Sequence, residues 1–310
     1  MSNNEDSAGE PETAEPLPRS SSSGTNYASA LVQVDLGAVT HRGYTRTNNE
    51  DHCLVVRFER SLKTLITNLP KSVLPSSFDE VGFGMLVADG MGGVAAGEVA
   101  STTAICKLVE LAVSTPDWIM KLEEPDYVAT VMQRMTERFR TVDNALRERA
   151  EIDFFLRGMG TTLTVALSLG AELLIGHIGD SRAYLLHDGE LHQLTRDHTL
   201  AQEMIDAGVI HPTDKVATAM RRVLTAALGS TGERMDPQVQ RLSLTDGDQV
   251  LLCSDGLTEM AKEEDIAAVL READGANQSC HALVDLALRG GGLDNITVVL
   301  ARYKFPPTDR

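Results

Sequence analysis

Acidic residues follow two apolar runs of the sequence at positions that suit metal chemistry. Asp89 follows the run 85–88, Asp255 follows the run 250–253, and a glycine comes after each aspartate. A carboxylate at the end of a buried strand is held rigidly yet meets solvent, and the glycine lets the backbone turn sharply beside an ion. Mg²⁺ and Mn²⁺ prefer oxygen ligands of this kind. A single Asp-Gly pair is more often a simple turn, but two such pairs favour a metal site.

Two further segments place acids in polar or glycine-rich sequence. Glu50 and Asp51 follow two asparagines, and Asp294 follows three glycines and a leucine. No cluster of histidine and cysteine competes for a softer metal. The four cysteines lie far apart without a Cys-x-x-Cys pair, which favours free thiols in a reducing compartment over a zinc site.

The composition is ordinary for a soluble globular protein, but the charge is strongly acidic. The 310 residues are 42% hydrophobic and 24% charged, with a net charge of -17. That charge argues against a nucleic-acid partner, which needs a basic surface. No apolar run reaches the roughly 18 residues of a membrane span, and the N-terminus lacks the features of a signal peptide. We therefore expect a cytoplasmic protein that does not contact a membrane, with a monomer as the default state.

The elements that must position these acids come in groups along the chain. Short apolar runs typical of strands recur from about residue 31 onward. Two long stretches with helical spacing of apolar residues interrupt them, and two shorter ones lie near the C-terminus. These four expected helices are 95–113, 126–150, 263–272 and 276–288.

The helices come in pairs between clusters of strands, which predicts an α+β fold. A doubly wound parallel sheet would need a helix after each strand, so antiparallel sheets with helices packed outside are favoured. Residues 1–28 are rich in Ser, Pro and Glu, and we expect them to be a disordered tail before a domain at 29–305. The span 59–80, with two prolines, is predicted to be an inserted loop. The segment 199–228 is helical and more polar.

Six short motifs carry a family resemblance. They are Arg-x-x-Asn-Glu-Asp at 46–51, Asp-Gly-Met-Gly-Gly at 89–93, Gly-Met-Gly-Thr-Thr at 158–162, Gly-Asp-Ser-Arg at 179–182, Ser-Asp-Gly at 254–256 and Asp-Asn-Ile-Thr at 294–297. Each motif alone is weak, but all six occur in the family's order. On these motifs the chain resembles the metal-dependent protein phosphatases (protein phosphatase 2C type) in their bacterial form, from about residue 31 to residue 303.

The resemblance implies a fold and a metal site. The fold would be a four-layer αββα sandwich, two antiparallel sheets flanked by helix pairs, with two Mn²⁺ or Mg²⁺ ions at one end. Asp89 should bridge both metals, and the Gly90 carbonyl should bind one of them. Asp255 and Asp294 should ligate the other.

The resemblance also implies roles around the metals. Glu50 and Asp51 should hold metal-bound waters, and Arg46 should contact the substrate phosphate with its planar donor fork. A third metal is plausible. Its ligands would be Asp153, with Glu151 as the alternative, and Glu259, where many relatives have an aspartate.

The implied function is a protein serine/threonine phosphatase, in which a metal-bridging water attacks the phosphorus of phosphoserine or phosphothreonine. Substrates would be phosphorylated proteins, with bacterial Ser/Thr kinases as counterparts. No phosphoenzyme is needed, so Cys253 is interpreted as a core residue. Two alternatives stay open: a catalytically inactive regulatory binding module, and a phosphohydrolase for small molecules.

Two other regions receive interpretations from the motifs. The segment 199–228 matches the flap of bacterial members, which is thought to influence substrate choice. The turn at 179–182 is interpreted as structural, with an internal salt bridge, rather than as a ligand site. His198 is interpreted as a helix cap, with a proton relay as the alternative.

Overall fold

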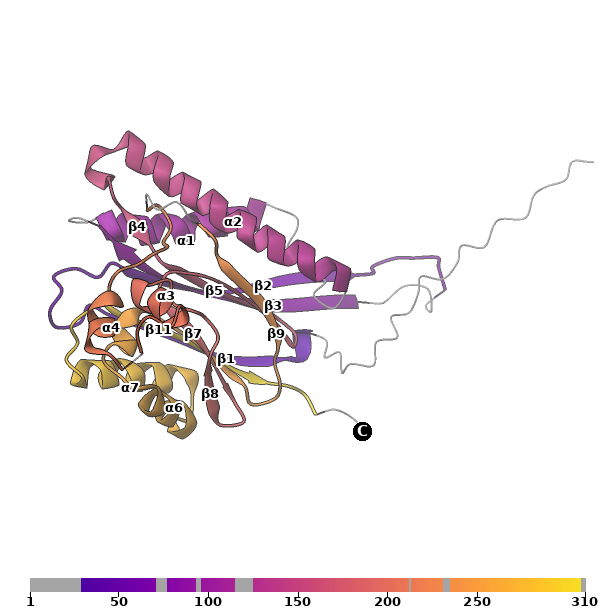
Figure 1. Cartoon of the computed structure of the whole chain (residues 1–310). Helices are drawn as coiled ribbons and strands as arrows, with labels where there is room; N and C mark the ends of the chain where they lie inside the picture. The colour runs from indigo at the N-terminus through magenta and orange to yellow at the C-terminus, as the bar shows by residue number, and fades with distance from the viewer. Residues whose placement is uncertain are drawn as a thin grey trace, which may run out of the picture.

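The chain folds into four layers, two antiparallel β-sheets face to face with helices on both outer faces (Figure 1). A computed structural model describes residues 29–70, 77–92, 96–114, 125–211, 213–230 and 235–307. The αββα sandwich predicted from the sequence is confirmed. The tail predicted for 1–28 lies outside the described residues.

One sheet has five strands in the order β1-β11-β10-β7-β8. Its strands are β1 (Gln33–His41), β7 (Arg182–His187), β8 (Glu190–Gln193), β10 (Gln249–Cys253) and β11 (Ile296–Lys304). The other sheet has six strands, of which five follow the order β2-β3-β5-β6-β9, while β4 pairs with β3. They are β2 (Asp51–Lys63), β3 (Ser77–Met91), β4 (Gly160–Thr161), β5 (Leu163–Leu169), β6 (Glu172–Ile178) and β9 (Gln238–Ser243).

Four helices cover the sheets, close to the bounds expected from the sequence. α1 (Ala96–Ser114) and α2 (Pro125–Ile152) lie on the six-stranded sheet, and α6 (Glu263–Glu272) and α7 (Ala276–Arg289) lie on the five-stranded sheet (Figure 1). The shorter elements are η1 (Ser29–Leu31), η3 (Phe154–Leu156), α3 (Leu200–Asp206), α4 (Lys215–Met220) and α5 (Asp255–Thr258). None of the helices in the described ranges is long and apolar enough to cross a membrane.

Three apolar clusters hold the layers together, one at each interface. The helical stripe of α2 illustrates the first, since Met135, Phe139, Val142 and Leu146 are almost fully buried. Each such side chain contributes about 1.5–3 kcal/mol when removed from water. Gly176 of β6 lets Phe139 approach, because a Cβ there would lie 2.9 Å from the ring. The four cysteines, all within the described residues, are free, and Cys253 is buried as expected.

The span predicted to be an inserted loop is partly strand, and that prediction is wrong at both of its ends. β2 continues to Lys63 and β3 begins at Ser77, and the two pair in register out to Lys63 and Ser77. Within this extension the Arg60 guanidinium lies 3.2 Å from the Glu80 carboxylate, a contact between residues distant in the sequence that no local pattern shows. Within the span, 71–76 lies outside the described residues.

The close approach of α7 to β1 depends on a glycine, which gives a prediction. A Cβ on Gly37 would lie 2.5 Å from the backbone carbon of Ala276. Gly37→Ala should therefore lower the free energy of unfolding by about 2 kcal/mol, measured by urea denaturation. Gly275→Ala is the control, since its Cβ would meet only Asp35, at 3.6 Å, and should cost less than about 1 kcal/mol. Equal effects of the two substitutions would contradict this packing.

Candidate functional site

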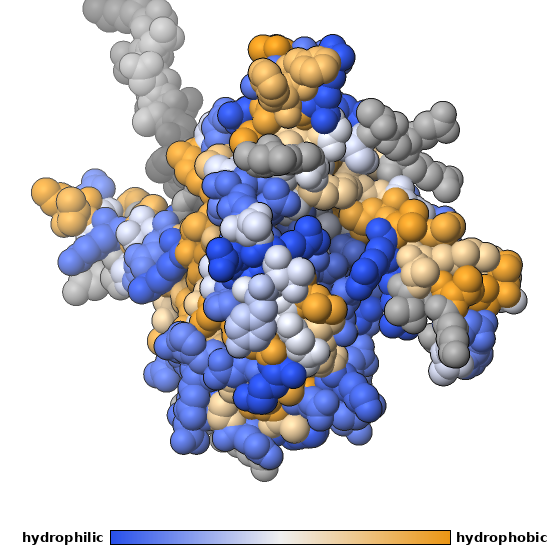
Figure 2. Space-filling view, turned by 90° about the vertical axis from the view of Figure 1, so that its left-hand side faces the viewer, coloured by the Kyte–Doolittle hydropathy of each residue, from blue (hydrophilic) through white to orange (hydrophobic). Residues whose placement is uncertain are grey.

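A polar cavity of about 490 Å³ opens at the end of the sandwich where β3 and β10 finish. Figure 2 shows this end of the molecule, with hydrophilic side chains gathered around a hollow. Two arginines, Arg46 and Arg222, lie in its wall. Six acidic residues also line it: Glu50, Asp89, Asp180, Asp255, Glu259 and Asp294. The cavity therefore brings together acids from five of the six motifs.

Asp89 is fixed at the end of β3 by a pair of threonines. Its backbone N–H donates to the Thr162 hydroxyl at 2.9 Å. Its carbonyl accepts from the Thr161 hydroxyl and from the Thr162 N–H, both at 2.9 Å. The two threonines of the motif at 158–162 thus hold the backbone of Asp89, which leaves its carboxylate free to face the cavity.

Asp255 is the first residue of α5, just after β10, and the preceding residue, Ser254, links the two sheets. The Ser254 hydroxyl donates to the Asp51 carboxylate at 2.7 Å and accepts from the Thr297 N–H at 2.9 Å. Asp51 is opposite Asp89 in the β2–β3 register. The strand ends of both sheets are therefore tied together behind the cavity. Asp51 is 3% exposed and lies behind the cavity lining rather than in it.

Gly90 is required by the close approach of α1. A Cβ on Gly90 would lie 2.1 Å from the Gly97 carbonyl oxygen, and a Cβ on Gly97 would lie 2.8 Å from the Glu50 carboxylate. Backbone, helix and carboxylate meet here with no room for a side chain. This packing fixes Glu50 at the edge of the cavity.

Asn295 holds the loop that carries Arg46 and Glu50. Its side-chain oxygen accepts from the Glu50 N–H at 2.8 Å, and its side-chain nitrogen donates to the carbonyls of Arg42 and Asn48, each at 2.9 Å. Asn295 is only 5% exposed, so these bonds are protected from water. Asn295 belongs to the Asp-Asn-Ile-Thr motif at 294–297, which by itself indicated no role for this side chain.

Arg46 reaches across the cavity mouth to Asp294. One guanidinium nitrogen lies 2.6 Å from the Asp294 carboxylate, while the Arg46 side chain stays 53% exposed. The pair joins residues 248 positions apart in the sequence. The Asp294 carboxylate raises the pKa of Arg46, so the guanidinium remains charged and available to an anion at the cavity mouth.

Burial and mutual repulsion disturb the acids of this site. Desolvation, followed by the charges of neighbouring acids, raises the pKa values of Asp89 and Asp255 well above the ordinary range. Desolvation also raises the pKa of Asp51 to about 6 and that of Asp180 to about 7. One carboxylate oxygen of Asp51 and one of Asp255 are buried without a hydrogen-bond partner. Cations bound among these carboxylates would offset their mutual repulsion and would give the unpartnered oxygens of Asp51 and Asp255 a counter-charge.

These donors fit hard divalent cations, which take carboxylate oxygens and carbonyls. As the side chains stand, the described residues contain no group of three or more acids, histidines or cysteines close enough to hold an ion. The crowded acids and the unpartnered oxygens still mark this end of the sandwich as the place where cations could bind.

Asp180, rather than Asp153, faces the cavity. Asp153 is exposed, and its carboxylate caps η3 by accepting from the Phe155 N–H at 2.9 Å. Glu259 does line the cavity. The missed signal at Asp180 is an acid after the apolar strand β6, the same pattern that singled out Asp89 and Asp255.

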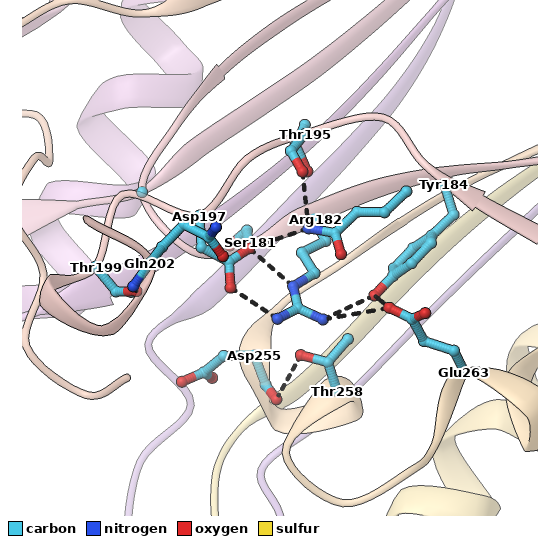
Figure 3. A network of polar contacts seen from close by, with 12 residues as sticks. Ser181, Arg182, Tyr184, Thr195, Asp197, Thr199, Gln202, Asp255, Thr258 and Glu263 are labelled. Atoms are coloured by element: carbon cyan, nitrogen blue, oxygen red, sulfur yellow. Dashed lines mark hydrogen bonds and ion pairs between the residues drawn. The ribbon is translucent and has the colours of Figure 1, made fainter. Parts of the chain in front are cut away.

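Arg182 of the motif at 179–182 forms a salt bridge, but with Asp197 outside the motif rather than with an acid inside it. The Arg182 guanidinium donates to both carboxylate oxygens of Asp197, at 2.8 and 2.7 Å, and also to the Tyr184 hydroxyl at 3.0 Å (Figure 3). This salt bridge supports the structural role expected for the turn, but Asp180 of the same turn lines the cavity, so the turn also belongs to the candidate site.

The fold and the cavity define a class of protein. The family described as protein phosphatase 2C matches residues 77–286, and the chain belongs to this family. Among its relatives, serine/threonine protein phosphatase PstP of Mycobacterium tuberculosis is 41% identical over 217 residues, which is 70% of this chain and 40% of that protein. This chain thus spans well under half the length of the mycobacterial relative. Protein phosphatase PhpP of Streptococcus pneumoniae is 32% identical over 86% of this chain and 96% of its own length.

Solved structures agree with this family. The crystal structure of Mycobacterium tuberculosis PstP/Ppp has a TM-score of 0.70 and 35% identity, covering 87% of this chain and 99% of that chain. The catalytic domain of PstP in complex with two manganese ions has a TM-score of 0.68 and 34% identity, covering 88% of this chain and 99% of that chain.

The raised pKa of Asp180 gives a prediction for the metal-free protein. Because its pKa is higher in the folded state than in the unfolded state, Asp180 lowers stability as pH rises from about 4 to about 7. In EDTA, Asp180→Asn should raise Tm at pH 8 by about 3 °C or more, and by less at pH 5. Calorimetric scans at both pH values measure this. Asp153→Asn, at an exposed acid outside the cavity lining, is the control and should not raise Tm at pH 8; a lower Tm for Asp180→Asn at pH 8 would contradict the assignment.

Proposed function

We propose that this protein is a metal-dependent phosphatase that removes phosphate from phosphoserine and phosphothreonine of proteins. The observation that carries the proposal is the cavity itself, in which six acids and two arginines converge at the joined ends of two sheets. Membership of the protein phosphatase 2C family and the likeness to a manganese-bound catalytic domain support it.

In this proposal two divalent cations, Mn²⁺ or Mg²⁺, bind at the acids of the cavity. Asp89 and the Gly90 carbonyl would hold one side of the pair, and Asp255 with Asp294 the other. When bound, such ions neutralise charge on phosphoryl oxygens and lower the pKa of a coordinated water. Glu50, at the cavity edge, would orient water by hydrogen bonding. A third cation, if present, fits Asp180 and Glu259, since Asp153 does not line the cavity.

Arg46 and Asp51 would serve in different ways. Arg46 would bind and orient the substrate phosphate, because its exposed guanidinium stands at the cavity mouth and offers two parallel donors. Asp51, bonded to Ser254 behind the lining, would hold water and the strand ends in place. Phosphorylated proteins and their kinases as partners, a cytoplasmic location and a monomeric state remain predictions.

The direct test is hydrolysis of a phosphothreonine peptide and a phosphotyrosine peptide, each with Mn²⁺, Mg²⁺ or EDTA. We expect phosphate release from phosphothreonine that needs metal. Asp255→Asn should lower kcat at least about a hundredfold, because a lost metal ligand costs several kcal/mol of transition-state stabilisation. No release under either metal, from folded protein, would favour a binding module; release from small phosphoesters alone would favour a small-molecule phosphohydrolase.

Arg46→Ala separates phosphate binding from metal binding. Loss of a charged hydrogen-bond donor should raise KM about tenfold or more. Mn²⁺ affinity, measured by calorimetry, should stay equal or increase, because Asp294 loses its ion-pair partner. Arg42→Ala is the matched control, since Arg42 lies in the same loop and donates to the Thr47 carbonyl outside the cavity lining. Weaker Mn²⁺ binding by Arg46→Ala would show that Arg46 supports the acids instead.

A further inference from the structure

The flap, residues 199–228, leaves the domain and returns to it side by side. An isolated antiparallel bridge joins Thr199 to Leu224. Next to it, the Thr225 N–H donates to the carbonyl of His198 at 2.9 Å. We call residues 198–200 and 223–225 the neck of the flap. Because the two halves of the neck are bonded to each other, they should move as one unit relative to the sandwich.

The flap forms one wall of the cavity, at the neck and just before it. Leu224 and Arg222 both line the cavity. The Arg222 guanidinium lies 3.4 Å from the Glu259 carboxylate, and its side chain is 66% exposed. Asp180 and Asp255 line the same cavity from the sandwich. The width of the cavity therefore depends on where the neck is held.

His198 ties the neck to the turn that carries Asp180. Its ring Nδ1 accepts from the Gly179 N–H at 3.0 Å, and its backbone N–H donates to the Gly179 carbonyl at 2.7 Å. Gly179 is the residue before Asp180, and its φ of 110° suits only glycine. Two hydrogen bonds thus join the neck to the backbone of Gly179, next to Asp180.

A buried histidine supports this contact from behind. The rings of His177 and His198 are stacked, with centroids 5.2 Å apart and planes at 13°. His177 is fully buried between the Thr164 hydroxyl, at 2.9 Å, and the Gly179 carbonyl, at 3.1 Å. Burial lowers the pKa of His177 to about 3, so this ring is neutral, and its two hydrogen bonds fix its orientation. One face of the His198 ring therefore packs against an immobilised aromatic ring.

The residues on both sides of His198 are also anchored (Figure 3). Asp197 is gripped by Arg182 through two bonds. Thr199 caps α3 by accepting from the Gln202 N–H at 3.2 Å, so the cap is Thr199 and the interpretation of His198 as a cap is wrong. Between these two anchors, the imidazole of His198 is directed to the Gly179 backbone.

We propose that His198 is a positioning residue that fixes the flap neck to the Asp180 turn and so sets the opening of the cavity for protein-sized substrates. This rests on the proposed phosphatase function and concerns which substrates enter. A phosphopeptide extends beyond the cavity and must meet the flap wall at Arg222 and Leu224. A small phosphoester needs only the acids and Arg46.

Kinetics on two substrates test this role. His198→Ala should lower kcat/KM for a phosphothreonine peptide about tenfold, mostly through KM, while p-nitrophenyl phosphate hydrolysis changes less than about twofold. His198→Asn should restore peptide activity, because the asparagine oxygen can accept from the Gly179 N–H where Nδ1 does. His192→Ala, at an exposed histidine of β8, is the control and should behave as wild type. An equal loss on both substrates, or no rescue by asparagine, would overturn the proposal.

Limited trypsin digestion tests the same role without using activity. Arg221 and Arg222 are exposed beside the neck. Cleavage after them should be about tenfold faster in His198→Ala and at the wild-type rate in His198→Asn. Thr225→Pro, which removes the N–H bonded to the His198 carbonyl, should accelerate the same cut. An unchanged cleavage rate in His198→Ala would overturn the positioning role. Accelerated cleavage alongside a wild type that hydrolyses neither substrate would support the positioning role and reject the phosphatase function.

Discussion

Repulsion among buried carboxylates is the constraint around which this structure is organised. Asp89, Asp180 and Asp255 are crowded where strands of two sheets end, and burial alone already disfavours their charged forms. Such a site lowers stability unless cations bind. The three apolar clusters offset that cost, because they fill both helix–sheet interfaces and the space between the sheets.

Two parts of the molecule surround the cavity: the ends of the sandwich strands with their loops, and the flap. Asp89 is bonded through its backbone to Thr161 and Thr162, and the loop bearing Arg46 is held by buried Asn295. These bonds lie within the sandwich and resist displacement. The flap, by contrast, is joined to the sandwich by a small number of contacts: the bonds of its neck, the Arg222–Glu259 ion pair and the bridge between Leu228 and Thr161.

Much of the fold followed from local patterns, and the long-range contacts did not. Paired helical stretches between strand clusters predicted antiparallel sheets with helices outside, and the family resemblance predicted the four-layer sandwich. Acids after apolar runs singled out Asp89 and Asp255. Asp180 was missed because its motif also forms the Arg182 salt bridge, which is a sufficient structural reason for its residues. The extension of β2 and β3 was missed because it depends on pairing between residues distant in the sequence, such as Arg60 and Glu80. The Arg46–Asp294 pair joins distant segments, so no spacing rule reveals it.

The central claim is that the acids at the joined strand ends are a divalent-cation site. Anomalous diffraction from crystals grown with Mn²⁺ tests it most directly, since it locates the metal without reference to activity. The account predicts anomalous peaks within bonding distance of the Asp89 and Asp255 carboxylates, with Arg46 displaced from Asp294. The absence of a peak at saturating Mn²⁺, or peaks only at other surface acids, would contradict it.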